Sequence, residues 1–323
     1  MPDSFIVGVD VAKATFDIAL PLDKPGKFQT RSKLPNDPKG FAELKAWLDK
    51  HAPSAALCME ATGIYHEALA TFLYEHGFTV YVVNPYQIAH FAKSELLRTK
   101  TDRTDAKLIA RFAASRPDLR PWQPLSPAQR TLRAYVYRLE DLMQMKQMEE
   151  NRLDVANPLV VDSIQRHLAD LSGQIAEVRR LIDDHIDSDP DLKGDRHLLE
   201  SIPGIGPRVS SILLACVGDL RHFDDPGKLT AFVGLNSFLR ESGTWKGSRA
   251  IAKLGSALVR AKMYMSAVTA MTHNPLIRAF VQRLRARGKP YLVAIVAAMR
   301  KLLHIAWGVV RSGRPFDARI GVA

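Results

Sequence analysis

The chain has 323 residues, of which 46% are hydrophobic and 24% are charged. These values exclude a mainly disordered chain, a collagen-like repeat and a small disulfide framework. At about 150 residues per domain, the length predicts about two domains.

The whole chain has a formal net charge of +11, and most of the positive charge lies in its C-terminal part. Residues 1–125 carry +2, residues 126–200 carry −5 and residues 201–323 carry +14. A domain-sized segment with this excess predicts a polyanionic partner, and nucleic acid is the usual one. A basic surface that only aids solubility is the alternative.

Nothing in the sequence predicts a secreted or membrane protein. Cys58 and Cys216 lie in apolar runs and are interpreted as buried thiols of a reducing compartment. The N-terminus lacks the layout of a signal peptide, and the nine-residue run YLVAIVAAM is shorter than the ~20 residues that span a bilayer. We therefore expect a cytoplasmic protein.

The first part of the chain alternates between strand and helix patterns. Strands are expected at 5–11, 15–20, 27–33, 55–60 and 78–83, and helices at 38–51 and 64–76. Three early strands in succession, followed by a βαβ unit, predict an α/β domain with a mixed central sheet.

Four prolines in 117–127 predict a boundary, because no helix passes through such a stretch. A polar helix is expected at 127–152 and ends before Pro158. The next helix carries apolar residues at 164, 168, 171, 175, 178 and 182, which is a heptad pattern. It predicts a helical hairpin, an intermolecular coiled coil, or a helix packed on its own domain.

From residue 198 the chain is helical and basic. LLESIPGIGPRVSSILLACVG (198–218) is typical of a helix–hairpin–helix, in which Gly204 and Gly206 let the backbone approach a phosphate. A plain tight turn between helices is the alternative.

Four carboxylates stand at positions that suggest a metal site. Asp10 and Glu60 end predicted strands, whereas Asp102 and Asp105 share one face at the start of a helix. Carboxylate oxygens suit Mg²⁺ or Mn²⁺, and two such ions assist phosphoryl displacement. This is the layout of ribonuclease H-like nucleases, including Holliday-junction resolvases.

A second candidate site lies in GLNSFLRESGTWKGSRAIAKLG (234–255), where Ser242 is surrounded by cations. Those cations are Arg240, Lys246, Arg249 and Lys253. They could hold a phosphodiester while the serine attacks it. Alternatively, the serine only donates a hydrogen bond in a phosphate-contacting loop.

Motifs along the whole chain resemble one family. They are GVDVAK (8–13), MEATGIY (59–65), VNPYQIAHFAKSELLRTKTDRTDAKLIARF (83–112), LLESIPGIGP (198–207), AFVGLN (231–236), ESG (241–243), KLGSALVRAKMYM (253–265) and RSGRPFD (311–317). In order and spacing they are similar to DEDD-type insertion-sequence transposases of the "one-ten" family, which are bridge-RNA-guided serine recombinases related to pilin-gene invertases.

The resemblance implies an N-terminal RuvC-like domain whose acidic set is Asp10, Glu60, Asp102 and Asp105, with Mg²⁺ (or Mn²⁺) bound. It implies that Ser242 attacks DNA and becomes covalently linked to it. The implied partners are target and donor DNA, a structured guide (bridge) RNA and further copies of the chain, as a dimer or tetramer, with no membrane. The implied location is the nucleoid of a prokaryotic cell.

The predicted organisation has four parts. Residues 1–116 form the RuvC-like domain, 117–126 a proline-rich linker, 127–192 a helical coiled-coil segment, and 193–323 a mainly α-helical transposase domain with the helix–hairpin–helix. Nucleic acid is expected to contact Gly204, Gly206, Arg240, Lys246, Arg249, Lys253 and Arg260.

The chain departs from the family pattern at Ser237, where proline is common, and at Ala261 and Lys262, where arginine and alanine are frequent. Two other functions remain open from the residues alone. One is a metal-dependent nuclease or junction resolvase that uses only the acids. The other is a non-enzymatic architectural DNA-binding protein.

Overall fold

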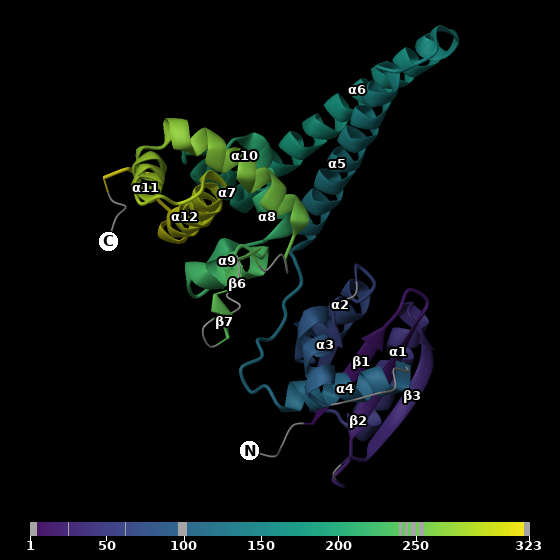
Figure 1. The fold of residues 1–323 in the computed structure, drawn as a ribbon. Helices are drawn as coiled ribbons and strands as arrows, with labels where there is room; N and C mark the ends of the chain where they lie inside the picture. Colours follow the sequence, from purple (N-terminus) through teal and green to yellow (C-terminus); the bar gives the residue numbers. More distant parts are fainter. Residues whose placement is uncertain are drawn as a thin grey trace. The chain divides into compact units, whose positions relative to one another are not determined.

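A computed structural model describes residues 5–24, 26–61, 63–95, 102–238, 241–242, 245–246, 250–251 and 255–319, without the side chains of 102–104 and 237–250. It divides the chain into two compact units, Met1–Pro124 (unit 1) and Leu125–Ala323 (unit 2) (Figure 1).

Unit 1 is a three-layer α/β structure. Its strands are β1 (Ile6–Val11), β2 (Thr15–Pro21), β3 (Phe28–Pro35), β4 (Ala56–Glu60) and β5 (Val80–Val83). Its helices are α1 (Pro38–His51), α2 (Glu67–Glu75), α3 (Pro85–Ser94) and α4 (Asp102–Ala114). The sheet order is β3-β2-β1-β4-β5, with β2 antiparallel to both neighbours and β1, β4 and β5 parallel. The predicted mixed sheet is confirmed.

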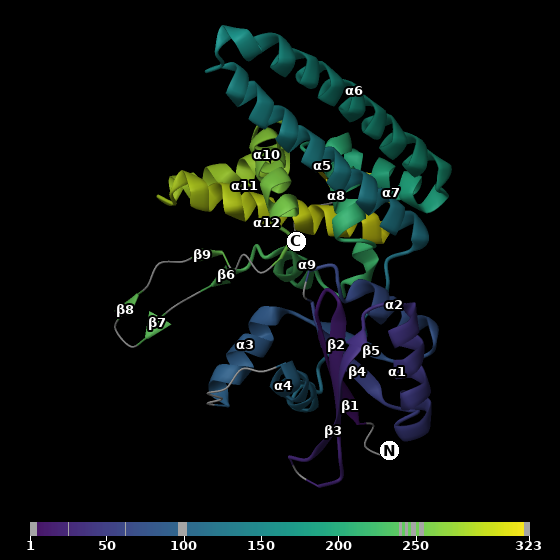
Figure 2. The same ribbon diagram turned by 90° about the vertical axis from the view of Figure 1, so that its right-hand side faces the viewer.

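Each face of the sheet has its own apolar core. Val7 and Val9 of β1 pack in one cluster with Leu44 of α1 and Leu69 of α2. Cys58 of β4 belongs to a second cluster, which is built mainly from α3 and α4. Side chains alternate along a strand, so α1 and α2 cover one face while α3 and α4 cover the other (Figure 2).

Unit 2 begins with two long helices, α5 (Pro127–Leu153) and α6 (Pro158–Ser188), which form an antiparallel hairpin (Figure 1). Leu171 and Ile175 of the heptad are buried in it, at 2% and 7% exposure. At these two positions the heptad side chains are therefore buried by the hairpin of a single chain, which is the first of the three predicted arrangements.

The remainder of unit 2 is mostly helical. Its helices are α7 (Pro190–Glu200), α8 (Pro207–Cys216), α9 (Pro226–Val233), α10 (Ala257–His273), α11 (Pro275–Ala286) and α12 (Tyr291–Ser312). Two small sheets pair β6 (Ser237–Phe238) with β9 (Ala250–Ile251) and β7 (Glu241–Ser242) with β8 (Trp245–Lys246).

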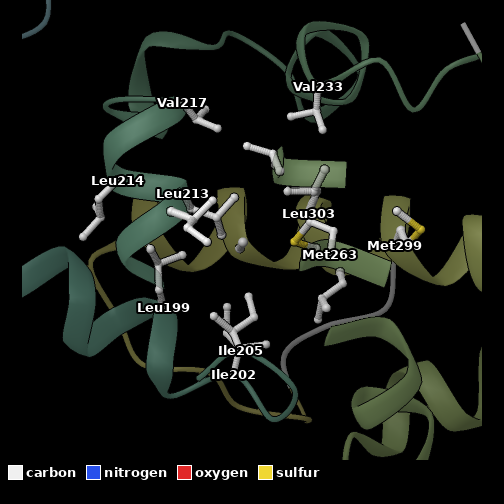
Figure 3. Packing of buried hydrophobic residues seen from close by; sticks show 14 of the residues in the cluster. Leu199, Ile202, Ile205, Leu213, Leu214, Val217, Val233, Met263, Met299 and Leu303 are labelled. Atoms are coloured by element: carbon white, nitrogen blue, oxygen red, sulfur yellow. The ribbon is translucent and has the colours of Figure 1, made fainter. Parts of the chain in front are cut away.

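The core of unit 2 is assembled around α12. Met299 and Leu303 of this helix pack with Met263 of α10 and Leu213 of α8 (Figure 3). By length and composition α12 is the one helix in the described part of the chain that could cross a membrane, and half of its most apolar stretch is buried. A helix at the centre of a protein core meets the same criterion.

Candidate functional site

The first candidate site lies where β1 and β4 end. These strands are parallel, and Val9 is paired with Met59, so Asp10 and Glu60 follow at matching positions. Neighbouring strands are about 4.8 Å apart, and matching residues point to the same face. The sheet therefore places the Asp10 and Glu60 carboxylates on one face of adjacent strands.

That face is the one covered by α4. A Cβ on Gly8 would lie 2.0 Å from the Ala106 oxygen and 2.5 Å from the Ala110 nitrogen, so α4 crosses β1 directly over Gly8. Asp10 is two residues further along β1 and points to the same side. Asp105 precedes Ala106 and is half-buried. The fold thus brings Asp105 to the sheet face that bears Asp10.

Asp102 is the first residue of α4, and its side chain lies outside the described part of the structure. Among the described residues, no group of three or more His, Cys, Asp or Glu is placed to hold a metal ion. The arrangement of all four predicted carboxylates around a metal therefore stays a prediction.

Sequence reasoning missed a further carboxylate at this edge. Asp17 of β2 is directly paired with Asp10 across the antiparallel ladder, so it lies on the same face. Its Oδ1 accepts a 2.7 Å hydrogen bond from the Lys33 backbone N–H. Like charges directly opposite each other repel, and this amide partly offsets the charge of Asp17. The available signal was the polar residue in the alternating strand TFDIAL.

Asn36 was also missed, although it connects the loops that follow β1 and β4. Its Nδ2 donates to the Ala12 oxygen at 3.0 Å and to the Tyr65 oxygen at 3.1 Å. Its backbone N–H donates to the Ala14 oxygen at 2.9 Å. Asn36 therefore holds together the two loops next to Asp10 and Glu60.

The second candidate site is the strand pair that contains Ser242. Ser242 is opposite Trp245 in the β7–β8 ladder, and Glu241 is opposite Lys246. In sequence the β6–β9 pair encloses this pair of strands, and Figure 2 labels all four short strands. The Ser242 and Lys246 side chains lie outside the description, as do Arg240, Arg249 and Lys253.

Arg260 contacts the backbone on both sides of the segment that carries these four short strands. Its Nη1 donates to the Val233 oxygen at 3.0 Å and to the Gly255 oxygen at 2.6 Å. Burial lowers the pKa of the Arg260 guanidinium from its usual value. Arg260 is predicted to contact phosphate, but one of its terminal nitrogens therefore already donates to backbone oxygens of unit 2.

The two glycines of the turn between α7 and α8 differ in their surroundings. Gly204 has a φ of +108°, and a Cβ there would lie 2.6 Å from the Ala270 Cβ. The close approach that Gly204 permits is therefore to α10 of the same unit. Gly206 is exposed at the N-cap of α8, with nothing within 4 Å of a Cβ placed on it. Of the pair, Gly206 is the one open to a ligand.

A buried acidic residue explains the unusual lysine of the α10 motif. Glu140 of α5 accepts from Arg208 of α8 at 2.6 Å and from Lys262 of α10 at 2.8 Å. Its side chain is only 9% exposed, so both cations offset the cost of burying its charge. Lys262 thus links α10 to α5 through the buried Glu140 carboxylate.

Comparisons with known proteins agree across both units. A family model for IS110-type DEDD transposases matches residues 7–156, and a model described as "Transposase IS116/IS110/IS902 family" matches residues 196–282. The two matches together span both candidate sites.

Individual relatives extend the similarity over nearly the whole chain. The pilin gene-inverting protein of Moraxella bovis is 33% identical over 320 residues, which cover 97% of this chain and 98% of that protein. The corresponding protein of Moraxella lacunata matches equally well. The transposase for insertion sequence element IS1111A of Coxiella burnetii is 26% identical over 307 residues, covering 84% and 79%. The chain belongs to the IS110/IS116/IS902 family of transposases, which are enzymes that rearrange DNA.

Proposed function

We propose that this protein is a DNA recombinase that excises and inserts an insertion sequence through a covalent serine–DNA intermediate. The observation that carries the proposal is that two transposase family models match this one chain, the first over Asp10 and Glu60 and the second over Ser242. The matched position of Asp10 and Glu60 on the sheet face that α4 covers adds a rigid acidic edge. Membership of a transposase family supports it, as do relatives named for gene inversion and for transposition.

Unit 1 acts in this proposal as a RuvC-like, ribonuclease H-like domain. Its sheet order, its helices on both faces and its carboxylates at the ends of β1 and β4 support that assignment. The turn between α7 and α8 acts as a helix–hairpin–helix that contacts the DNA backbone. The exposed Gly206 at the start of α8 supports this contact.

The acidic residues suit a hard divalent cation. The donor set consists of carboxylate oxygens, which Mg²⁺ and Mn²⁺ prefer over softer ligands. We assign Asp10, Glu60, Asp102 and Asp105 as its ligands, and Asp17 as a neighbour that adds negative charge. A bound cation would stabilise negative charge on a phosphodiester. The carboxylates of β1 and β4 supply two ligand positions on one rigid sheet.

Ser242 acts as the nucleophile. Its Oγ forms a bond to phosphorus while the bond from phosphorus to one bridging oxygen breaks, and the freed oxygen takes up the proton that Oγ loses and becomes a hydroxyl. Lys246, Arg240, Arg249 and Lys253 belong to the same segment, and their cations would stabilise the charge that grows on the phosphate oxygens.

The choice of DNA sites belongs to a structured guide RNA, and the active assembly is a dimer or tetramer. The excess of positive charge in residues 201–323 supports a nucleic-acid partner. The protein acts on chromosomal DNA in the cytoplasm of a prokaryotic cell.

A metal-dependent nuclease is the second candidate. One observation favours it: β1, β4 and α4 of unit 1 alone bring together Asp10, Glu60 and the start of α4. Such an enzyme would release hydrolysed DNA and would not need Ser242.

Trapping the covalent intermediate separates the two functions. Full-length protein, Mg²⁺, DNA spanning the ends of the element and RNA transcribed from its flank are mixed, denatured and separated on a gel. Wild type, Ser242→Ala, Asp10→Asn and the matched control Ser248→Ala are compared. We expect a protein–DNA adduct in wild type and Ser248→Ala only. Cleaved DNA without an adduct, formed equally by Ser242→Ala, would establish the nuclease instead.

A further inference from the structure

The turn between α11 and α12 presents a strongly basic surface that neither candidate site uses. It comprises Arg283, Arg285, Arg287, Lys289, Tyr291, Leu292 and Val293, all of them exposed, which we call the α11–α12 basic turn. The match to the second family model ends at residue 282, just before it.

Within the described part of the chain, none of these four cations lies close enough to a carboxylate to form an ion pair. The sequence contains no Asp or Glu between Glu241 and Asp317. Among the ion pairs of the described residues, none involves Arg283, Arg285, Arg287 or Lys289. Elsewhere, surface cations such as the half-buried Arg31 and the exposed Arg180 are paired with acids. The cationic charge of the turn is therefore available to an external anion.

One aromatic and two apolar side chains follow the cations in sequence and are exposed. Tyr291 is 49% exposed, Leu292 64% and Val293 50%. The Arg285 guanidinium lies 6.0 Å from the centre of the Tyr291 ring, and its Nη1 donates to the Lys289 oxygen at 2.8 Å. Cations at a helix C-terminus are favourable in themselves, but that effect explains neither Lys289, which lies beyond the helix, nor the exposed ring.

Cations beside an exposed aromatic ring are the groups that bind unpaired nucleic acid. Phosphates contact the cations, and an unstacked base stacks on the ring. An anionic membrane would also attract the charge. However, Ala294 and Ile295 are fully buried in unit 2, so the exposed apolar stretch ends after three residues. A membrane-bound helix needs a longer apolar face than that.

We propose that the α11–α12 basic turn binds a single-stranded segment of nucleic acid, with Tyr291 as a base-stacking platform and Arg283, Arg285, Arg287 and Lys289 as phosphate contacts. The proposal rests on the proposed function only in taking the protein to act on nucleic acid. The segment can come from RNA or from DNA strands that are opened during recombination.

The first test measures salt dependence with the full-length protein. Fluorescein-labelled oligouridylate RNA, oligothymidylate DNA and a blunt duplex are titrated by anisotropy at several NaCl concentrations. The variant replaces Arg283, Arg285, Arg287 and Lys289 by alanine. The matched control replaces Arg31, Arg116, Arg180 and Lys193, four cations at the surface that each have a carboxylate partner.

Each phosphate contact to a single strand contributes about 0.7 to the slope of log affinity against log salt. We therefore expect the slope to fall by about three in the variant and to change little in the control. A larger change with oligouridylate would identify RNA as the source, and a larger change with oligothymidylate would identify DNA. Equal slopes in variant and control would overturn the proposal.

The second test concerns the ring. Tyr291→Ala should weaken single-strand binding on the order of tenfold and leave duplex binding unchanged, whereas Tyr291→Phe should retain wild-type affinity. If the quadruple variant instead loses binding to phosphatidylserine vesicles and keeps its oligonucleotide affinity, the surface is a membrane contact and the proposal is wrong. The Ser242 adduct is measured separately, so failure of the recombinase function would leave this binding result intact.

Discussion

The two candidate sites are held in place by very different amounts of structure. Asp10 and Glu60 end strands in the middle of a five-stranded sheet, with α4 packed directly over Gly8. Among the described residues, Ser242 belongs to a two-residue strand that pairs with another two-residue strand. An isolated two-stranded hairpin is marginal in water, whereas a larger sheet covered by helices is stable. The sheet therefore determines where Asp10 and Glu60 lie relative to each other.

The two sites depend on different contacts. The acidic edge depends on close backbone packing, on the β1–β4 register and on the Asn36 hydrogen bonds. The Ser242 strand pair depends on the contacts that Arg260 and Gly255 make with the end of α9. Substitutions at these supports should affect one unit at a time.

The largest expected effects come from two glycines, one in each unit. A Cβ on Gly8 would lie 2.0 Å from the Ala106 oxygen, and a Cβ on Gly255 would lie 2.0 Å from the Phe232 oxygen. Because backbone must move in each case, Gly8→Ala and Gly255→Ala should each cost about 3 kcal/mol of unfolding free energy. Calorimetry should show each variant shifting the transition of its own unit.

The control for this pair is Gly173→Ala in α6, where a Cβ meets nothing within 4 Å. It should stabilise unit 2 by about 0.5–1 kcal/mol, because alanine favours a helix over glycine. Equal shifts of both transitions in Gly8→Ala would show that the two units unfold as one.

A second large effect is expected in the helical hairpin. Leu171→Ala removes a side chain that is 2% exposed and should cost about 3 kcal/mol. Leu159→Ala, at 91% exposure, should change stability by less than about 0.5 kcal/mol. Urea unfolding followed by circular dichroism measures both. If Leu171→Ala halves the mass in light scattering without loss of stability, the heptad serves an intermolecular coil instead.

A smaller effect is expected at Asn36. Asn36→Leu removes both Nδ2 donors and leaves the Ala12 and Tyr65 carbonyls without them, which should cost unit 1 about 1–2 kcal/mol. It should also reduce adduct formation, because the loops beside Asp10 and Glu60 lose their connection. Asn151→Leu on the exposed face of α5 is the control and should leave both measurements unchanged.

The smallest effect is a pH dependence confined to unit 2. Burial, and then the nearby Arg300 and Lys301, lower the pKa of His304, while Asp225 opposes them. The folded state therefore favours neutral His304, so its contribution is complete above the ordinary pKa near 6.5 and declines as the pH falls through that value. Between pH 7.5 and 5.5, wild type should lose more stability than His304→Gln. Parallel curves for the two proteins would contradict this.

Much of the fold could be predicted because its signals are local. Helix starts are encoded by a capping side chain followed by proline. The capping side chain accepts hydrogen bonds from the first free N–H groups, and the proline pre-sets the backbone dihedral. This pair begins α1, α3, α5, α6, α7, α9 and α11. The same prolines mark the ends of the preceding segments, so the expected helix at 38–51 agrees with α1 residue for residue.

The candidate site was predictable only in its residue types. Asp10 and Glu60 were recognisable because each ends an apolar strand, but Asp17 and Asn36 joined the site through the β1–β2 register and a distant turn. Lys262 looked like a departure from the family pattern until the structure paired it with Glu140 of another helix. Such partners are far apart in sequence, and no local pattern identifies them.

The sequence by itself determined the five strands of unit 1 with α1 and α2, the helical character and the positive charge of the C-terminal part, and the family. These depend on side-chain periodicity, capping chemistry and charge, which act between near neighbours. Only the tertiary structure decided that the heptad helix pairs with α5 of its own chain, that Gly204 packs on α10, and that Asp10, Glu60 and Asp17 share the face under α4. These outcomes depend on strand register and close packing, which are set when segments distant in sequence meet.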